Sequence, residues 1–340
     1  MNNLEKINIY VPDDVYYVLH HDAVEFEILK SNGKGNLNRF LSLLIIGYQA
    51  QYTTEYTDNR DRIIEILNGI DGFSTTKIDE LANRVMQNVL YPSITRRKGK
   101  KSKSVSLKPT TSTEGYILSA EQNTDNGTLS QYFCRMFMAY AKKNQAERER
   151  IVFKEKLDYL NTSCRKGLSV RFALKNNPSY LHTVIPFRVS SGHEELHNYL
   201  LCQELDQGRL CAASYRLDRI VNYTSCAIED SSINPVIKER LDRMVRYGPQ
   251  YRINSDDITK VLLTTQGIRD FGRVYYGRPE PIDIVKNADG SAVYCFQCSD
   301  DQLYLYFRRF DNVAILEPER LKNRIRDFHQ RALECVEREI

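Results

Sequence analysis

The residues with the most evident chemistry are a tyrosine and four arginines in the middle of the chain, Tyr199, Arg188, Arg209, Arg216 and Arg219. Each lies in a stretch whose apolar pattern predicts a β-strand or its end. Guanidinium groups bind phosphate oxygens through paired hydrogen bonds and also stack on bases. A tyrosine ring offers a flat face to a base. The five residues together predict a groove for a flexible polyanion.

The same residues also admit a purely structural interpretation. Arg219 has the acidic residues Asp218 and Asp206 near it in the sequence, and either would neutralise it. Tyr199 would then be a core residue. If the groove exists, unpaired bases suit it better than a duplex, because they are free to stack on an aromatic ring and duplex bases are not.

A second concentration of positive charge lies near residue 100. It consists of Arg96, Arg97, Lys98, Lys100, Lys101 and Lys103. No acidic residue balances this segment, which would contact phosphates with strong salt dependence and without choosing a sequence. The alternative is a solvated linker. The formal net charge of the chain is only +4, so local clustering and not total charge favours a nucleic-acid partner.

Patterns typical of catalysis are absent from the sequence. It has no glycine-rich phosphate loop, serine elbow or paired-carboxylate pattern. Cys295 and Cys298 form a CxxC pair, but no further ligands lie nearby at zinc-site spacing, so we expect core thiols. His193 and His197 flank two glutamates and lack a third ligand. We therefore expect a non-enzymatic protein with no cofactor and no metal.

Length and composition fit a multidomain protein of the cytoplasm. The 340 residues, 41% of them hydrophobic and 27% charged, suggest two or three domains. No apolar run reaches the ~18 to 20 residues that cross a bilayer. The first residues also lack the apolar stretch of a signal peptide. We expect a cytoplasmic chain without a membrane partner.

The first fifty residues predict a strand and two helices. Apolar and polar residues alternate over residues 6–11, and Pro12 ends the strand. A helix then runs to about Leu29, and Asn36 caps a second helix that extends through Tyr48. The polar face of the strand carries Lys6, Asn8 and Tyr10.

The same order of elements recurs after residue 104. A strand near residues 105–109 precedes a weak helix, a turn, and a helix that Thr128 caps. Residues 36–40 and 128–132 share the pattern cap, leucine, polar, polar, aromatic. We therefore divide residues 1–145 into two imperfect repeats, residues 5–56 and 104–143, with intervening helices and the basic loop 96–103. Their strands must pair as an antiparallel ribbon, within one chain or between two.

Each repeat resembles a ribbon-helix-helix unit. In proteins of that kind, the outer face of the ribbon enters the DNA major groove and the helix caps hold phosphate. The resemblance therefore implies nucleic-acid contacts for Lys6, Asn8, Tyr10 and Asn36. A polar face is also what any half-exposed strand shows, and a solvated face is the alternative.

The remaining chain predicts three further parts. A charged linker helix at residues 146–165 precedes five short strands at residues 166–230, which suit a small SH3/Sm-like β-barrel. Residues 231–340 predict a helix and then the ferredoxin-like βαββαβ order. The predicted fold class is therefore α+β. A last helix carries Leu321, Ile325 and Phe328 on one face, which packs either on its own sheet or on the partner of a homodimer.

Residues 166–230 resemble a WYL domain. Asn198-Tyr199-Leu200 stands at the position of the Trp-Tyr-Leu triplet, without its tryptophan, and residues 215–220 match the family element aromatic-Arg-Leu-Asp-Arg-Ile. Residues 306–310 and 315–321 are similar to the extension that commonly follows such domains. The resemblance implies that the barrel binds nucleic acid or a small effector through the triplet tyrosine and surrounding arginines. It also implies dimer contacts for the extension, residues 231–340.

The combination of ribbon-helix-helix-like repeats with a WYL-type barrel resembles the WYL accessory proteins encoded beside type VI-D CRISPR systems. That resemblance implies single-stranded RNA binding by a homodimer and modulation of an RNA-guided effector nuclease. The alternative is a WYL-family transcription regulator that binds DNA through the ribbon and senses a small ligand through the barrel.

Overall fold

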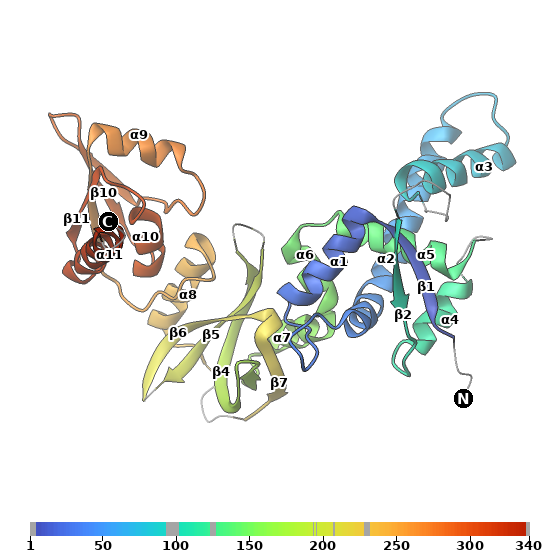
Figure 1. Ribbon diagram of the computed structural model, residues 1–340, viewed down its shortest axis with the longest axis horizontal. Helices are drawn as coiled ribbons and strands as arrows, with labels where there is room; N and C mark the ends of the chain where they lie inside the picture. The colour runs from blue at the N-terminus through green and yellow to red at the C-terminus, as the bar shows by residue number, and fades with distance from the viewer. Residues whose placement is uncertain are drawn as a thin grey trace. The chain divides into compact units, whose positions relative to one another are not determined.

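The chain divides into two compact units, Met1–Asp158 and Tyr159–Ile340 (Figure 1). The computed structural model describes residues 5–92, 102–122, 127–192, 194, 196–206, 208–227 and 232–337. Helices and antiparallel sheets occur in both units, so the fold class is α+β. The boundary between the units falls within the predicted linker, residues 146–165.

The first unit pairs the strands of the two predicted repeats within one chain. Strand β1 runs antiparallel to β2, with Ile7 opposite Leu107 and Pro12 opposite Ser102. The ribbon-helix-helix assignment itself stays a prediction. The elements of this unit are β1 (Ile7–Pro12), α1 (Asp13–Glu25), α2 (Leu37–Asn68), α3 (Thr75–Val85), the π-helical turn η1 (Met86–Leu90), β2 (Ser102–Leu107), α4 (Glu114–Gln122), α5 (Leu129–Ala141), α6 (Gln145–Val152) and the start of α7 (Lys154–Lys166).

Alternation and capping set the local structure of this unit. Ile9 and Val11 of β1 are fully buried in its core, while Asn8 between the apolar positions is exposed. The side chain of Asn36 accepts a hydrogen bond from the backbone N–H of Arg39 and so caps α2. Thr128 caps α5 in the same way, within a capping box. Both predicted caps are confirmed.

Helix lengths in this unit differ from the sequence prediction. Helix α2 does not end at Tyr48 but continues to Asn68, because Tyr52 and Tyr56 extend its apolar stripe along the core. Residues 60–90 therefore hold the end of α2, then α3 and a π-helical turn. The predicted charged helix is interrupted at Phe153, whose ring packs against Phe26 with the centroids 6.0 Å apart.

A buried ion pair joins α1 to α6. The carboxylate of Asp22, which is fully buried, accepts hydrogen bonds from Nε and Nη2 of Arg148 at 2.7 and 3.0 Å. The hydroxyl of Tyr140 in α5 donates to the same carboxylate at 2.7 Å. Burial, and then the nearby Asp22 charge, raise the pKa of Tyr140 well above its usual value. The guanidinium here is matched by a carboxylate.

The second unit begins with a five-stranded antiparallel sheet in the order β6-β5-β4-β3-β7. All five strands were expected from the sequence. Strands β3 to β6 lie side by side in chain order, and β7 pairs with β3 at the opposite edge from β6. The SH3/Sm-like name stays a prediction. The elements are the end of α7, β3 (Val170–Leu174), β4 (Asn177–Ser191), β5 (Asn198–Asp206), β6 (Arg209–Arg216), the 3-10 turn η2 (Leu217–Arg219) and β7 (Ile220–Ser225).

One face of this sheet encloses a buried polar network. Nδ1 of His182 lies 2.7 Å from Oε1 of Glu204, and the Tyr215 hydroxyl donates to the other oxygen of that carboxylate. Burial and the hydrogen bond to Glu204 raise the pKa of Tyr215. Tyr215 also packs edge-on against Phe172. The aromatic residue of the WYL-like element is therefore a core residue.

The other face of the sheet carries helix α8 (Pro235–Tyr247), which is the helix predicted at the start of residues 231–340. Leu241 and Met244 of α8 share one core with Leu201 and Ala212 of the barrel. A second sheet of order β11-β8-β10-β9 follows, with one helix after β8 and one after β10. This element order was expected, and the ferredoxin-like name stays a prediction. Its elements are β8 (Thr259–Leu263), α9 (Thr265–Arg273), β9 (Asp283–Lys286), β10 (Ala292–Phe296), α10 (Asp300–Phe307), β11 (Val313–Glu317) and α11 (Glu319–Glu337).

Helix α11 uses its apolar face within the chain. Leu321 and Ile325 are buried in the core of this unit, and Phe328 packs on Tyr304 with the ring centroids 6.1 Å apart. The predicted dimerisation residues thus pack on their own chain, which was one of the two alternatives. In the part of the chain that the structure describes, no helix combines the length and the apolar character that a membrane span requires.

Candidate nucleic-acid interface

Tyr199 lies near the start of β5, on the face of the barrel sheet that carries helix α8. It is directly opposite Arg216 on β6 and Ser190 on β4. Its neighbour Leu200 is fully buried on the face of the polar network, opposite Tyr215, so alternation turns the Tyr199 ring to the other face, which it shares with Leu201. The side chain is half-buried. The predicted proximity of Tyr199 and Arg216 is present in the structure.

The guanidinium of Arg216 already forms hydrogen bonds within the chain. Its Nε and Nη2 donate to the two carboxylate oxygens of Asp218 at 3.0 and 2.8 Å, and Asp218 is fully buried. The acidic residue that the sequence offered as a partner for Arg219 therefore binds Arg216. Arg219 itself lies half-buried in the turn η2. The side chain of Asp206, the other partner considered for Arg219, lies outside the described residues.

The remaining two predicted arginines are exposed but separated along the sheet. Arg188 is opposite Leu201, two residues from Tyr199 along the same face. Arg209 begins β6 at the end far from Arg216, so at ~3.3 Å per residue it is roughly 20 Å from Tyr199. The four predicted arginines therefore do not converge. Arg188 and Arg216 stay near the ring and Arg209 does not.

A cavity of about 330 Å³ adjoins Tyr199 where the barrel meets the C-terminal part of the same unit. Tyr251 and Tyr276 add two further rings to its wall, and the exposed fraction of Tyr276 is 59%. Arg308 and Arg309, at the end of α10, line the same cavity. The cavity therefore brings to Tyr199 aromatic and basic residues that were not among the predicted site residues.

Neither of these two arginines forms an ion pair within the described part of the chain. The Arg308 guanidinium stacks over the rings of Tyr304 and Phe328, 5.4 and 5.1 Å from their centroids. Arg309 donates to the backbone carbonyl oxygens of Tyr306 and Tyr276 at 3.2 and 3.4 Å. Carbonyls and ring faces orient a guanidinium but leave its charge uncompensated. The cavity wall is therefore positive at this end.

Two glutamines of the cavity wall each have a buried side-chain oxygen. Oε1 of Gln302 and Oε1 of Gln250 are buried without a hydrogen-bond partner among the described residues. Nε2 of Gln250 donates to Glu194, an acidic residue of the wall, at 3.1 Å. An unsatisfied buried acceptor costs about 1 to 3 kcal/mol. A ligand with N–H groups, such as a base edge, would remove this cost.

Sequence reasoning missed most of this wall. The sequence places residues 306–310 in the WYL-like extension, but it predicted no binding role for Arg308 or Arg309. Tyr276 and Gln302 carry no local signal, because only the fold brings α10 and the loop after α9 to Tyr199. The doublet of arginines beside aromatic residues was the one usable indication.

The N-terminal ribbon presents part of its predicted surface. Lys6 and Asn8 are exposed and Tyr10 is half-buried, on the face opposite the core. Lys103 lies elsewhere: it is opposite Val11, on the inward face, and its Nζ donates to the Tyr17 hydroxyl at 2.9 Å. Lys103 therefore does not belong to the outer face of the ribbon.

Two further N-terminal predictions have different outcomes. The side-chain oxygen of Asn36 is engaged as the cap of α2, so phosphate would meet the free N–H groups of the first turn rather than this side chain. The basic segment lies outside the described residues, namely Arg96, Arg97, Lys98, Lys100 and Lys101.

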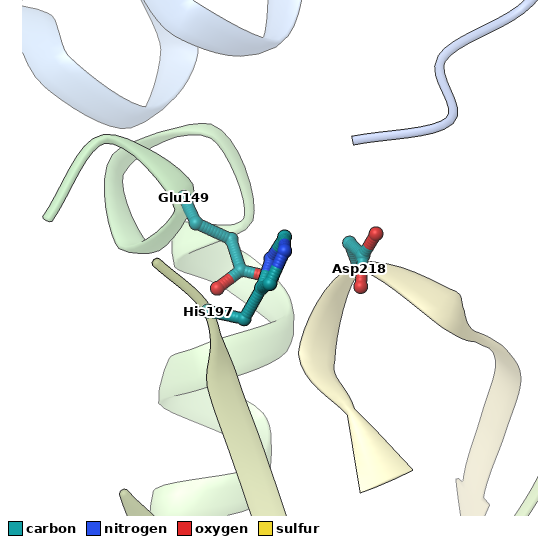
Figure 2. Close-up of side chains that lie close together, drawn as sticks. All are labelled: Glu149, His197 and Asp218. Atoms are coloured by element: carbon teal, nitrogen blue, oxygen red, sulfur yellow. The ribbon is translucent and has the colours of Figure 1, made fainter. Parts of the chain in front are cut away.

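The structure offers little support for a metal centre. Within the second unit, ligand atoms of His197 and Asp218 lie within 4.8 Å of each other (Figure 2). Two ligands do not make a metal site, and both oxygens of Asp218 already bind Arg216. Glu149, also drawn in Figure 2, belongs to α6 of the first unit and is not counted with them. Of the CxxC pair, Cys298 is buried, which raises the pKa of its thiol to about 12, and Cys295 is half-buried.

Comparison with known proteins places the fold but not a family. No protein-family model matches the chain, and no curated protein matches it. A solved structure described as "Crystal structure of a CRISPR Cas-related protein" is 19% identical, with a TM-score of 0.64, over 100% of this chain and 97% of that chain. Proteasome accessory factor B/C of Arthrobacter aurescens is 15% identical, with a TM-score of 0.26, over 66% of this chain and 36% of that chain, which is too weak for any inference. The chain therefore shares its fold, along its length, with a CRISPR Cas-related protein.

Proposed function

We propose that this chain is a non-enzymatic accessory protein of a CRISPR system that binds single-stranded RNA at the cavity beside Tyr199. The observation that carries the proposal is the meeting of uncompensated charge with aromatic rings. Arg308 and Arg309 line the same cavity as Tyr199 and Tyr276, and neither makes an ion pair among the described residues.

The chemistry of the wall suits one unpaired nucleotide. A base stacks on the tyrosine rings, and the side-chain amides of Gln302 and Gln250 in the wall offer hydrogen-bonding groups to its edge. The flanking phosphates contact Arg308 and Arg309, and the exposed Arg188 extends the basic surface along the sheet. A volume of about 330 Å³ is at the small end for ligand sites and admits a single base but no duplex.

The shared fold supports the CRISPR assignment at a coarse level, since it is also the fold of a CRISPR Cas-related protein. The finer proposal is that this chain, as a homodimer, modulates an RNA-targeting type VI-D effector nuclease. It rests on the resemblance of the ribbon-helix-helix-like repeats and the WYL-type barrel to accessory proteins of those systems. Co-purification with such an effector, with and without RNA, tests it.

The direct test compares ligands and matched variants. Fluorescence anisotropy with labelled unstructured RNA and with duplex RNA should show preference for the single strand. The double variant Arg308→Gln, Arg309→Gln should lose at least tenfold in affinity, because its phosphate contacts are gone. Arg269→Gln removes an exposed arginine of the same unit outside the cavity and should leave affinity unchanged. Equal losses in both variants would reject the cavity as the RNA site.

One observation favours a second candidate, a DNA-binding regulator. The two strands of the first unit form an antiparallel ribbon whose outer face carries Lys6, Asn8 and Tyr10. In that case Lys6→Ala with Tyr10→Ala would abolish binding to a palindromic DNA duplex while single-stranded RNA binding would be weak in the unaltered protein.

A further inference from the structure

The first unit contains a cavity that the proposed RNA site does not use. It has a volume of about 300 Å³ and lies among α2, α3 and α5. Its wall carries three tyrosines and two arginines, together with small polar groups. The residues that matter are Tyr52, Tyr56, Tyr132, Arg60, Arg135 and Asn83.

Arg135 is the unusual member of this wall. Its exposed fraction is 6%, and its Nε has no hydrogen-bond partner within the described residues. Nor does its guanidinium form an ion pair with any described carboxylate. A guanidinium remains charged at any physiological pH, and burying it without an anion is costly. The buried Arg148 of the same unit has Asp22 as its anion, whereas Arg135 has none among the residues that the structure describes.

A second arginine is held at the edge of the cavity. Nη2 of Arg60 donates to Asp79 at 2.8 Å, and its Nε donates to Oδ1 of Asn83 at 3.0 Å. These bonds fix the side chain and leave Nη1 for a ligand. No acidic residue is among the described residues of the wall. The described wall therefore carries two cations and no carboxylate, and only Arg60 has a carboxylate partner, Asp79, outside it.

The aromatic part of the wall is packed into a defined shape. The rings of Tyr52 and Tyr132 meet edge to face with centroids 5.6 Å apart, and those of Tyr52 and Tyr56 lie 6.1 Å apart. The rings offer planar surfaces within the same cavity as the guanidinium groups. Phosphate next to a planar ring is the chemistry that such a wall complements.

We propose that this cavity binds a small phosphate ester carrying a planar ring, of which a nucleoside monophosphate is the simplest example. The phosphate takes the place of the missing anion between Arg135 and Arg60, and the ring lies against the tyrosines. Free nucleotides and the phosphorylated end of an RNA both have this chemistry. Because Asn83 belongs to α3 and Arg135 to α5, the ligand would tie the two helices together.

Thermal unfolding of the full chain provides the test. Inorganic phosphate should raise the midpoint temperature slightly, adenosine monophosphate should raise it more, and adenosine should leave it unchanged. Arg135→Met should abolish these shifts without lowering the midpoint of the ligand-free protein, because it removes an unpaired buried charge. Arg60→Gln, at the more exposed edge, should weaken binding at least several-fold. Arg62→Gln removes an exposed arginine of the same helix and should change nothing.

Two outcomes would overturn the proposal. One is the absence of any shift with phosphate or nucleotide at millimolar concentration. The other is a ligand-free Arg135→Met protein that unfolds earlier while the ligand shifts persist in Arg60→Gln, since Arg135 would then be structural. A nucleotide that binds no better than phosphate would remove the role of the tyrosine wall.

The source of the phosphate is resolved by competition. An RNA with a 5′-phosphate that displaces adenosine monophosphate, when the same RNA with a 5′-hydroxyl does not, identifies an RNA end as the ligand. Failure of both RNAs identifies a free nucleotide. These measurements use the Tyr199→Ala background, so that RNA held at the barrel does not contribute and the two proposals fail independently.

Discussion

Two regions around Tyr199 use arginine in opposite ways. At the end of β6, Nε and Nη2 of Arg216 donate hydrogen bonds to the buried carboxylate of Asp218. At the end of α10, Arg308 and Arg309 rest on rings and backbone carbonyls and meet no carboxylate among the described residues. Arg216, in the most recognisable motif, is therefore engaged within the barrel. The RNA contacts that we propose involve instead arginines that meet no carboxylate among the described residues.

The same contrast recurs in the first unit, where Arg148 is paired with Asp22 and Arg135 forms no ion pair with a described carboxylate. A paired buried arginine predicts a large effect on stability when it is removed, and an unpaired one predicts an effect on ligand binding. Variants of the two kinds of arginine should therefore differ in stability and in ligand affinity, and similar effects in both kinds would contradict this distinction.

The largest effect is expected for Arg148→Ala. Removing the arginine leaves the fully buried Asp22 without its counter-ion, so the free energy of unfolding should fall by about 3 to 5 kcal/mol. Urea denaturation of the full chain, followed by circular dichroism, measures it. Arg62→Ala, on an exposed position of the same unit, should change the free energy by less than about 0.5 kcal/mol. A double variant Asp22→Asn, Arg148→Met should lose less than Arg148→Ala, and an equal loss would contradict the assignment.

Much of the local structure on which this contrast rests was predictable. The alternation around Ile9 and Val11, the caps at Asn36 and Thr128 and the bounds of α8 follow from short-range patterns. The end of α2 does not follow from short-range patterns, because Tyr52 and Tyr56 are covered by helices distant in sequence. The polar residues after Tyr48, taken alone, favour a helix that ends earlier.

The candidate site was less predictable than the fold. Tyr199 and Arg216 were matched correctly because strand pairing follows from regular alternation. Their partners at Tyr276, Gln302 and Arg309 lie roughly 80 to 110 residues further along the chain, where no periodicity links them to the barrel. Charge pairing was equally hidden, since the sequence places Asp218 beside both Arg216 and Arg219 and only the fold shows that Asp218 binds Arg216.

The second effect in size is expected for Arg216→Gln. Because Asp218 loses two charge-assisted hydrogen bonds, the free energy of unfolding of the second unit should fall by about 2 kcal/mol. Affinity for single-stranded RNA, measured well below the unfolding midpoint, should change less than threefold. If the variant had normal stability but a tenfold lower RNA affinity, Arg216 would contact RNA, and pairing with Asp218 would not separate structural from RNA-binding arginines.

Tyr199→Ala should act on binding instead. Loss of one stacking face is expected to reduce affinity for unstructured RNA about tenfold, or about 1.4 kcal/mol, and to leave duplex binding unchanged. Tyr199→Phe keeps the ring and is the matched control, which should retain affinity within a factor of two. Anisotropy titrations at one salt concentration compare the three proteins. If Tyr199→Phe were as weak as Tyr199→Ala, the hydroxyl and not the ring face would be the binding group.

The smallest effect gives the sharpest test of the comparison, because it counts charges and not affinity alone. Each phosphate contact with a single strand contributes about 0.7 to the slope of log affinity against log salt concentration. Arg309→Gln should therefore lower the slope by about 0.7, since its charge is uncompensated in the free protein. Arg216→Gln should leave the slope as it is, because the charge of Arg216 is already balanced by Asp218 and releases no counter-ions from RNA. Equal slopes in the two variants would mean that pairing within the chain does not decide which arginines meet the RNA.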